Sequence, residues 1–76
     1  MKVYTIWFND CDGNLGFVDL EAESEAEVEG YTLLWWVSDT YGIDYGDVDT
    51  DGIDVWYERD GKRHVIMKNI SIEEAE

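Results

Sequence analysis

The sequence predicts an α+β domain in which one helix packs on one face of a four-stranded, mainly antiparallel sheet. Two pairs of segments rich in β-branched and aromatic residues predict the strands, and a turn signal inside each pair makes it a β-hairpin. An apolar repeat of helical spacing lies between the two pairs. The predicted order is therefore hairpin, helix, hairpin, in a single domain spanning residues 1–76.

The first hairpin is expected from residues 2–9 and 15–20, which are dense in residues that favour strands. Between them, residues 9–14 read Asn-Asp-Cys-Asp-Gly-Asn, a concentrated turn signal. A two-residue turn at either possible position gives the same division of side chains between the two faces. One face is then expected to carry Trp7, Val18 and Leu20, and the other Ile6, Phe8 and Phe17.

The helix is expected at about residues 25–40. Ser24 and Glu27 have the spacing of a capping box, and Gly42 stands where a glycine commonly follows the last helical turn. The apolar stripe predicted to face the sheet consists of Ala26, Gly30, Leu33, Leu34, Val37 and Tyr41. A second apolar set falls on the opposite side, where it would contact a partner or the following loop: Val28, Tyr31 and Trp35.

Residues 42–52 are rich in Gly and Asp and are predicted to form a loop. Strands are expected at 53–58 and 62–68, because Asp60-Gly61 between them is a strong signal for a two-residue hairpin turn. Residues 69–76 are expected to form a loosely held acidic tail.

This second hairpin has a defined register, with Glu58 opposite Arg63 and Trp56 opposite Val65. One face is expected to carry Ile53, Val55, Tyr57 and Ile66, and the other Trp56, Val65 and Met67. One helix covers only one face of a sheet, so the second apolar face requires the 42–52 loop, a second copy of the chain or a foreign partner.

The charge balance narrows the class of partner. Nineteen Asp and Glu against five Lys and Arg give a formal charge of −14, which opposes binding to nucleic acids or anionic membranes. The acids fall into two groups, the first of them strictly alternating: Asp19, Glu21, Glu23, Glu25, Glu27 and Glu29, then Asp39, Asp44, Asp47, Asp49, Asp51 and Asp54.

In extended backbone, carboxylates at i and i+2 lie about 6.6 Å apart on one face. This spacing is of the same order as that of phosphates along a nucleic-acid strand, about 3.4 Å of axis each. The acids are therefore interpreted as a substitute for phosphates before a basic nucleic-acid-binding protein, with Tyr31, Trp35 and Trp56 as apolar anchors. A generic acidic domain, dimeric or not, whose charge serves only solubility remains an alternative.

One acidic segment matches the EF-hand calcium loop, with Asp47, Asp49 and Asp51 before Gly52, and Glu58 six residues later. Carboxylates at these positions can converge on Ca²⁺. The context is unfavourable, because Asp54 stands where an aliphatic residue is usual, and the segment leads into a hairpin instead of a helix. A calcium-binding module is kept as an alternative; otherwise no cofactor is expected.

The residues usual in catalysis are sparse. Cys11 and His64 are each unique and are expected on different hairpins, and no glycine-rich phosphate loop is present. We therefore expect no catalytic residues and no enzyme activity. A single cysteine allows no internal disulfide, and the absence of a signal peptide or a long apolar run favours a cytoplasmic protein.

In its size, acidity and aromatic-rich α+β character, the chain resembles the small phage-encoded anti-CRISPR and anti-restriction inhibitors that mimic DNA. The resemblance covers the whole chain but no shared motif, so it assigns no individual residue. It implies a protein inhibitor without a cofactor, acting in the bacterial cytoplasm on the nucleic-acid-binding surface of a nuclease or surveillance complex.

Overall fold

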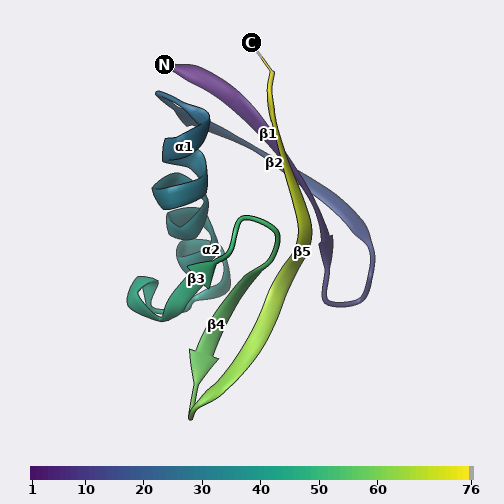
Figure 1. Cartoon of the computed structure of the whole chain (residues 1–76), viewed down its shortest axis with the longest axis vertical. Helices are drawn as coiled ribbons and strands as arrows, with labels where there is room; N and C mark the ends of the chain where they lie inside the picture. The colour runs from purple at the N-terminus through teal and green to yellow at the C-terminus, as the bar shows by residue number, and fades with distance from the viewer. Residues whose placement is uncertain (76) are drawn as a thin grey trace.

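A computed structural model describes residues 1–75 and shows one helix along one face of a five-stranded antiparallel sheet (Figure 1). The strand order across the sheet is β2-β1-β5-β4-β3. The strands are β1 Lys2–Asp10, β2 Leu15–Ala22, β3 Val48–Thr50, β4 Val55–Arg59 and β5 Lys62–Glu74. The predicted α+β class is confirmed, with one strand more than expected.

The additional strand, β3, comes from the segment predicted to be a loop. After a 3-10 turn, η2 (Tyr45–Asp47), the chain extends and pairs with β4, with Val48 opposite Tyr57 and Thr50 opposite Val55. Only three residues long, β3 is too short to show an alternating pattern in the sequence. Residues 48–50 of this segment therefore extend the sheet at its edge, while Ile43 is buried in the core and Tyr45 packs against it.

The expected loose tail is wrong for residues 69–74, because β5 continues to Glu74 and pairs along β1. Ala75 N–H donates to Val3 C=O at 2.8 Å and adds one more bond to this seam. Ile70 and Ile72 alternate along β5 and pack against the core. Glu76 lies outside the described residues.

The first hairpin has a three-residue loop instead of the expected two-residue turn. Asp10 N–H donates to Asn14 C=O, and Gly13, with φ +84°, donates to Asp10 C=O. The odd loop length shifts the register by one, so Ile6 lies opposite Val18 and Trp7 opposite Phe17. The predicted faces of this hairpin are therefore wrong: Val18 and Leu20 lie with Ile6 on the helix side.

The second hairpin has the predicted register, with Glu58 opposite Arg63 and Trp56 opposite Val65. Asp60 and Gly61 both have positive φ, as the predicted two-residue turn requires. A bulge then makes the register shift between Val55 and Trp56, so Met67 lies opposite Val55. Met67 is consequently on the helix side of the sheet, and its predicted position beside Trp56 is wrong.

The helix runs from Glu25 to Tyr41 in three consecutive segments: α1 Glu25–Glu27, η1 Val28–Thr32 and α2 Leu33–Tyr41. The predicted cap is present, since Ser24 Oγ accepts from Glu27 N–H, and Gly42 ends the helix with φ +68°. The η1 segment is π-helical: Leu33 N–H bonds Val28 C=O, five residues earlier.

This extra residue per turn rotates the following side chains by about 100° relative to an α-helix. Val28, expected on the outer side, is therefore fully buried in line with Leu33 and Val37. Ala26, Gly30 and Tyr41 were expected in the core stripe but are exposed. Tyr31 and Trp35 remain exposed, as predicted.

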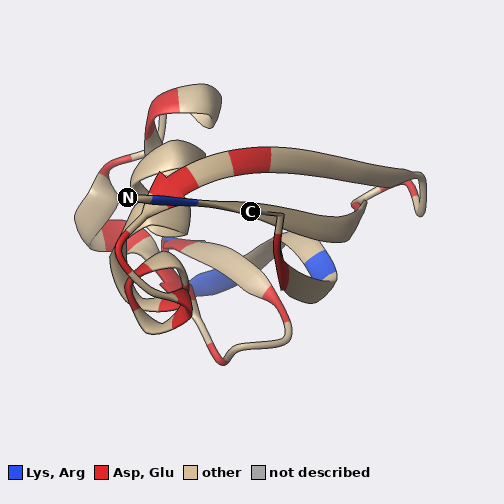
Figure 2. Cartoon of the chain, turned by 90° about the horizontal axis from the view of Figure 1, so that it is seen from above, with Lys and Arg blue, Asp and Glu red and all other residues tan. Residues whose placement is uncertain are grey.

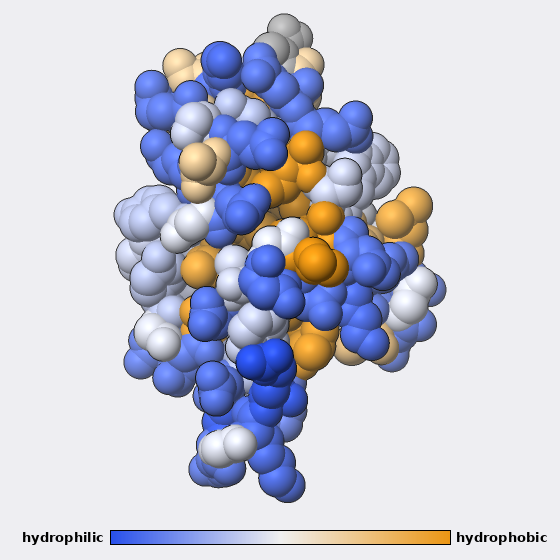
Figure 3. All heavy atoms as spheres, viewed as in Figure 1, coloured by the Kyte–Doolittle hydropathy of each residue, from blue (hydrophilic) through white to orange (hydrophobic). Residues whose placement is uncertain are grey.

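The core lies between the helix and the facing side of the sheet. Its fully buried side chains are Ile6, Leu33, Met67, Val28, Val37 and Val55. Figure 3 shows hydrophilic side chains at both ends of the molecule and apolar patches across the middle of this view. On the opposite side of the sheet, Trp7 and Phe17 pack together with ring centroids 5.1 Å apart, and Phe17 stays 59% exposed.

Candidate functional site

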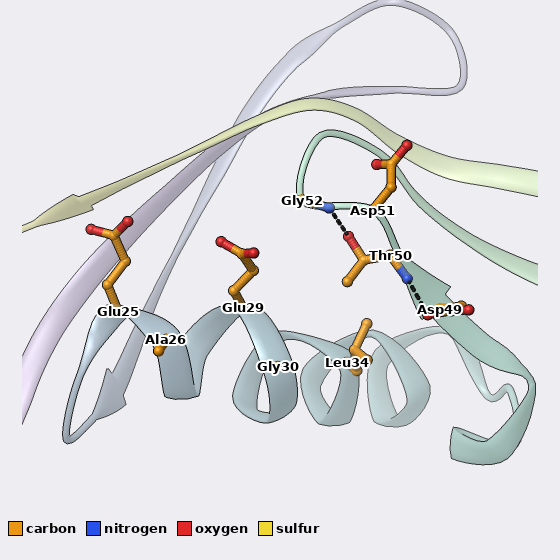
Figure 4. Close-up of a pocket in the computed structure, with 9 residues that line it drawn as sticks. All are labelled: Glu25, Ala26, Glu29, Gly30, Leu34, Asp49, Thr50, Asp51 and Gly52. Atoms are coloured by element: carbon orange, nitrogen blue, oxygen red, sulfur yellow. Dashed lines mark hydrogen bonds between the residues drawn. The ribbon is translucent and has the colours of Figure 1, made fainter.

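A groove of about 660 Å³ lies between the helix and the β3–β4 loop. In Figure 4, Glu25 and Glu29 rise from the helix, whereas the carboxylates of Asp51 and Asp49 point away from the helix on the loop side. The complete lining is Glu25, Ala26, Glu29, Gly30, Leu34, Asp49, Thr50, Asp51 and Gly52. Four acidic residues and a short apolar floor therefore line the groove, with two acids on the helix and two on the loop side.

The loop wall of the groove is held by its own hydrogen bonds. Thr50 Oγ1 accepts from Gly52 N–H at 3.1 Å and donates to Asp54 C=O at 2.7 Å. Asp51 Oδ1 accepts from Ile53 N–H at 2.9 Å and from Asp54 N–H at 2.8 Å. These bonds hold the loop in a defined conformation.

The helix wall owes its shape to the π segment, because Glu29 and Gly30 both belong to η1. Glu29 lies close against the loop: a Cβ at Gly52 would come 3.3 Å from Glu29 Oε1. Gly52 also has φ +88°, which favours glycine. The close approach of helix and loop therefore depends on a glycine at position 52.

No carboxylate of the groove forms an ion pair among the described residues, although the charge of Arg63 adds to the backbone N–H groups of Asp54 and Ile53 in lowering the pKa of Asp51. Among residues 1–75 the one ion pair is Lys2 Nζ to Glu74 Oε1, 3.6 Å apart and outside the groove. Both arginines lie in the β4–β5 hairpin over aromatic rings, Arg63 at 3.9 Å from the Trp56 centroid and Arg59 at 5.4 Å from that of Tyr57. The groove can therefore accept an ammonium or guanidinium group from outside.

The backbone N–H groups of Asp54 and Ile53 lower the pKa of Asp51 below its ordinary value, because hydrogen bonds to the carboxylate favour the charged form. Asp51 is therefore charged at neutral pH. The loop thus holds a negative charge in a fixed position at the rim of the groove.

The structure distributes the other predicted acids around the molecule. Figure 2 shows acidic positions over the helix, loops and strands. Asp19 and Glu21 are exposed on the open side of β2, and Asp19 accepts a hydrogen bond from Thr5 Oγ1 at 2.7 Å. Half-buried Asp54 accepts from Asn69 N–H. Exposed or half-buried positions outside the groove lining are also occupied by Glu23, Glu27, Asp39, Asp44 and Asp47.

Two of the three predicted aromatic anchors are on the surface. Tyr31 is 53% and Trp35 47% exposed, and Trp35 stacks on Tyr45 with ring centroids 5.0 Å apart. Tyr45, which the sequence did not indicate, lies 6.3 Å from Tyr31 and completes an aromatic cluster. Trp56 is only 6% exposed beneath Arg63, so its predicted role as a surface anchor does not fit its position.

The calcium-loop pattern falls on a β-hairpin. Asp47 ends η2, Asp49 lies in β3, Asp51 forms the loop, and Glu58 lies in β4. No entering or exiting helix is present, and residues 1–75 contain no group of three or more His, Cys, Asp or Glu side chains that could hold a metal. The spacing arises from strand alternation and a turn, and the EF-hand interpretation is not supported.

Cys11 and His64 lie in different parts of the structure. Cys11 is exposed in the β1–β2 loop, near enough to Tyr41 to contribute, after burial and Asp10, to the raised pKa of that tyrosine. His64 stacks on Tyr57 with ring centroids 4.9 Å apart, in the hairpin that the sequence indicated. Neither residue lines the groove.

Comparison with protein-family models, curated proteins and solved structures finds no match for this chain. Within the described residues, no helix has both the length and the apolar character needed to cross a membrane.

Proposed function

We propose that this protein is a non-enzymatic inhibitor of a basic, nucleic-acid-binding protein, such as a CRISPR or restriction complex. Its carboxylates would bind the Lys and Arg side chains with which that protein contacts phosphates. The observation that supports this best is the groove, whose lining includes Glu25, Glu29, Asp49 and Asp51 with no ion pair to any of them among the described residues. All four residues are exposed, and like charges gathered on one surface repel each other within the chain but attract Lys or Arg of a partner.

The groove has an aromatic neighbour that suits such a partner. Tyr31 and Trp35 each follow a groove residue in the helix, and Tyr45 packs against both. A partner arginine can lie over an exposed ring face while a neighbouring Lys or Arg enters the groove. The charges accelerate the encounter, and burial of the rings slows dissociation.

A matched pair of charge variants tests the proposal. The groove variant carries Glu25→Gln, Glu29→Gln, Asp49→Asn and Asp51→Asn. The control removes the same charge from exposed positions outside the groove, with Asp12→Asn, Glu58→Gln, Asp60→Asn and Glu73→Gln. The wild-type chain is used to capture proteins from nuclease-treated bacterial lysate, with elution by increasing salt.

We expect a nucleic-acid-binding protein to elute at moderate salt. Addition of the wild-type chain should displace DNA or RNA from that protein. The protein should bind the groove variant at least tenfold more weakly than wild type, a loss of about 1.4 kcal/mol in binding free energy. The control should lose much less affinity. Equal losses would show that total charge, not the groove, mediates binding. Retention of no basic protein would refute the proposal.

A further inference from the structure

Strand β2 forms an edge of the sheet and is unusually open to pairing. It is eight residues long, and its register with β1 is continuous from Lys2 opposite Ala22 to Asn9 opposite Leu15. Natural edge strands are commonly short, bulged, or protected by Pro or charged side chains, especially Lys; the charged residues of β2 are both acidic, Asp19 and Glu21. The opposite edge, β3, has only three residues, whereas β2 has neither a bulge, a proline nor a lysine.

The outward backbone groups of β2 follow from the hydrogen bonds of β1. Ala75 N–H donates to Val3 C=O, so the groups of Val3 face β5, and alternation directs those of Tyr4 and Ile6 toward β2. Their partners in β2 are Leu20 and Val18. The N–H and C=O groups that point away from the sheet therefore belong to Leu15, Phe17, Asp19 and Glu21.

The side chains of the same four residues lie on the side of the sheet that the helix leaves uncovered, and all four are exposed. Leu15 is 70% and Phe17 59% exposed. Asp19 and Glu21 follow at the next two alternate positions. The edge thus has an apolar half and an acidic half, and in both halves the same residues point their backbone N–H and C=O groups away from the sheet.

We propose that β2 binds an extended basic segment of a partner protein by strand addition. An antiparallel segment would place Lys or Arg opposite Glu21 and Asp19, and apolar residues opposite Phe17 and Leu15. A second copy of β2 is a poorer occupant, because in an antiparallel register its own carboxylates meet either carboxylates or the apolar half. The partner's basic character rests on the proposed function, but the site is separate from the groove.

The probe is a blocked synthetic peptide, Lys-Thr-Lys-Thr-Val-Thr-Val, with Glu-Thr-Glu-Thr-Val-Thr-Val as its control. We expect the basic peptide to slow hydrogen exchange of the Phe17, Asp19 and Glu21 amides, which point outward. The Val18 and Leu20 amides already bond β1 and should change little. The acidic peptide should protect none of them.

Two substitutions at Glu21 separate charge from backbone pairing. Glu21→Gln removes the charge and keeps the N–H, whereas Glu21→Pro removes both, at an edge position that tolerates proline because its N–H faces outward. We expect the peptide to bind Glu21→Pro about tenfold more weakly than Glu21→Gln, because proline removes the N–H that would donate a backbone hydrogen bond to the peptide. Preserved exchange protection in β1 confirms that both variants fold.

Equal binding to the two variants, or protection of groove amides such as Gly30 and Gly52 in place of β2, would overturn the proposal. Protection of β2 that grows with protein concentration alone would make a second copy the occupant and also overturn it. The peptide result does not depend on groove charges. If the groove variant loses the captured protein while the peptide fails to bind β2, the strand proposal fails and the proposed function stands.

Discussion

The acidic groove and the β4–β5 hairpin adjoin each other but hold their charged side chains differently. In the groove lining, none of the four acidic residues forms an ion pair. In the hairpin, Arg63 and Arg59 lie over the rings of Trp56 and Tyr57. The arginines therefore contact aromatic rings and form no ion pair with the groove acids, so the acidic surface adds repulsion that the core must offset.

The largest expected effect comes from removing the ring beneath Arg63. Trp56→Ala should lower the free energy of unfolding by about 3–5 kcal/mol, because a large buried side chain is lost. Trp35→Ala, at a 47% exposed position of the aromatic cluster, should cost less than about 1 kcal/mol. Urea unfolding of both variants measures the difference; similar losses would mean that the two aromatic groups contribute alike.

The role of Arg63 itself can be separated into charge and stacking. Arg63→Ala should lower the free energy of unfolding by about 1 kcal/mol, the upper end of the range for a cation–π contact at an exposed site. Arg63→Lys keeps the charge but loses the planar group, so it should restore only part of the loss. Full restoration by lysine would show that screening of the acids is the main role of this residue.

Salt tests the repulsion on the acidic side. Raising NaCl to near-molar levels should screen the exposed carboxylates and increase the free energy of unfolding by about 1 kcal/mol. For a domain of this size, that corresponds to about 4–8 °C in Tm by calorimetry. The groove variant, which lacks four of the repelling charges, should gain less from salt; an unchanged gain would place the repulsion elsewhere.

The smallest effect concerns the acid that fixes the groove loop. The pKa of Asp51 is lowered from its ordinary 3.8, so its contribution to stability is fully present above pH 3.8 and is lost as pH falls through the lower folded-state value. The difference in unfolding free energy between wild type and Asp51→Asn should therefore be constant above that pH and shrink below it. If the difference did not change with pH, the charge of the Asp51 carboxylate would not contribute to the stability of the loop.

Local signals in the sequence were sufficient for the elements they govern. Ser24 and Gly42 mark the helix ends, and Asp60-Gly61 sets the register of the second hairpin, because each feature depends on neighbouring residues alone. The predicted turn of the first hairpin is wrong, because the residues from Asp10 to Asn14 are compatible with a loop of two or of three residues. The loop length that forms depends on which side chains of the hairpin are buried in the core, and this is decided by tertiary packing.

The remaining differences depend on tertiary context. The π segment is favoured because it brings Val28 into line with Leu33, a gain that helical periodicity does not include. The end of β5 follows from pairing with β1, from Trp7 opposite Ser71 to Tyr4 opposite Glu74, although Ile70 and Ile72 already alternate in the sequence. The groove combines residues 25–34 with 49–52, and no local pattern indicates that these segments meet.

Strand β5 also has a consequence for the order of folding. Both hairpins close over short loops, whereas β1 and β5 pair residues as distant as Tyr4 and Glu74. Closing so long a loop is entropically costly, so the hairpins can form early while the β1–β5 seam forms late. Changes in that seam should chiefly accelerate unfolding with little effect on the refolding rate, and the seam then governs how long the native state persists.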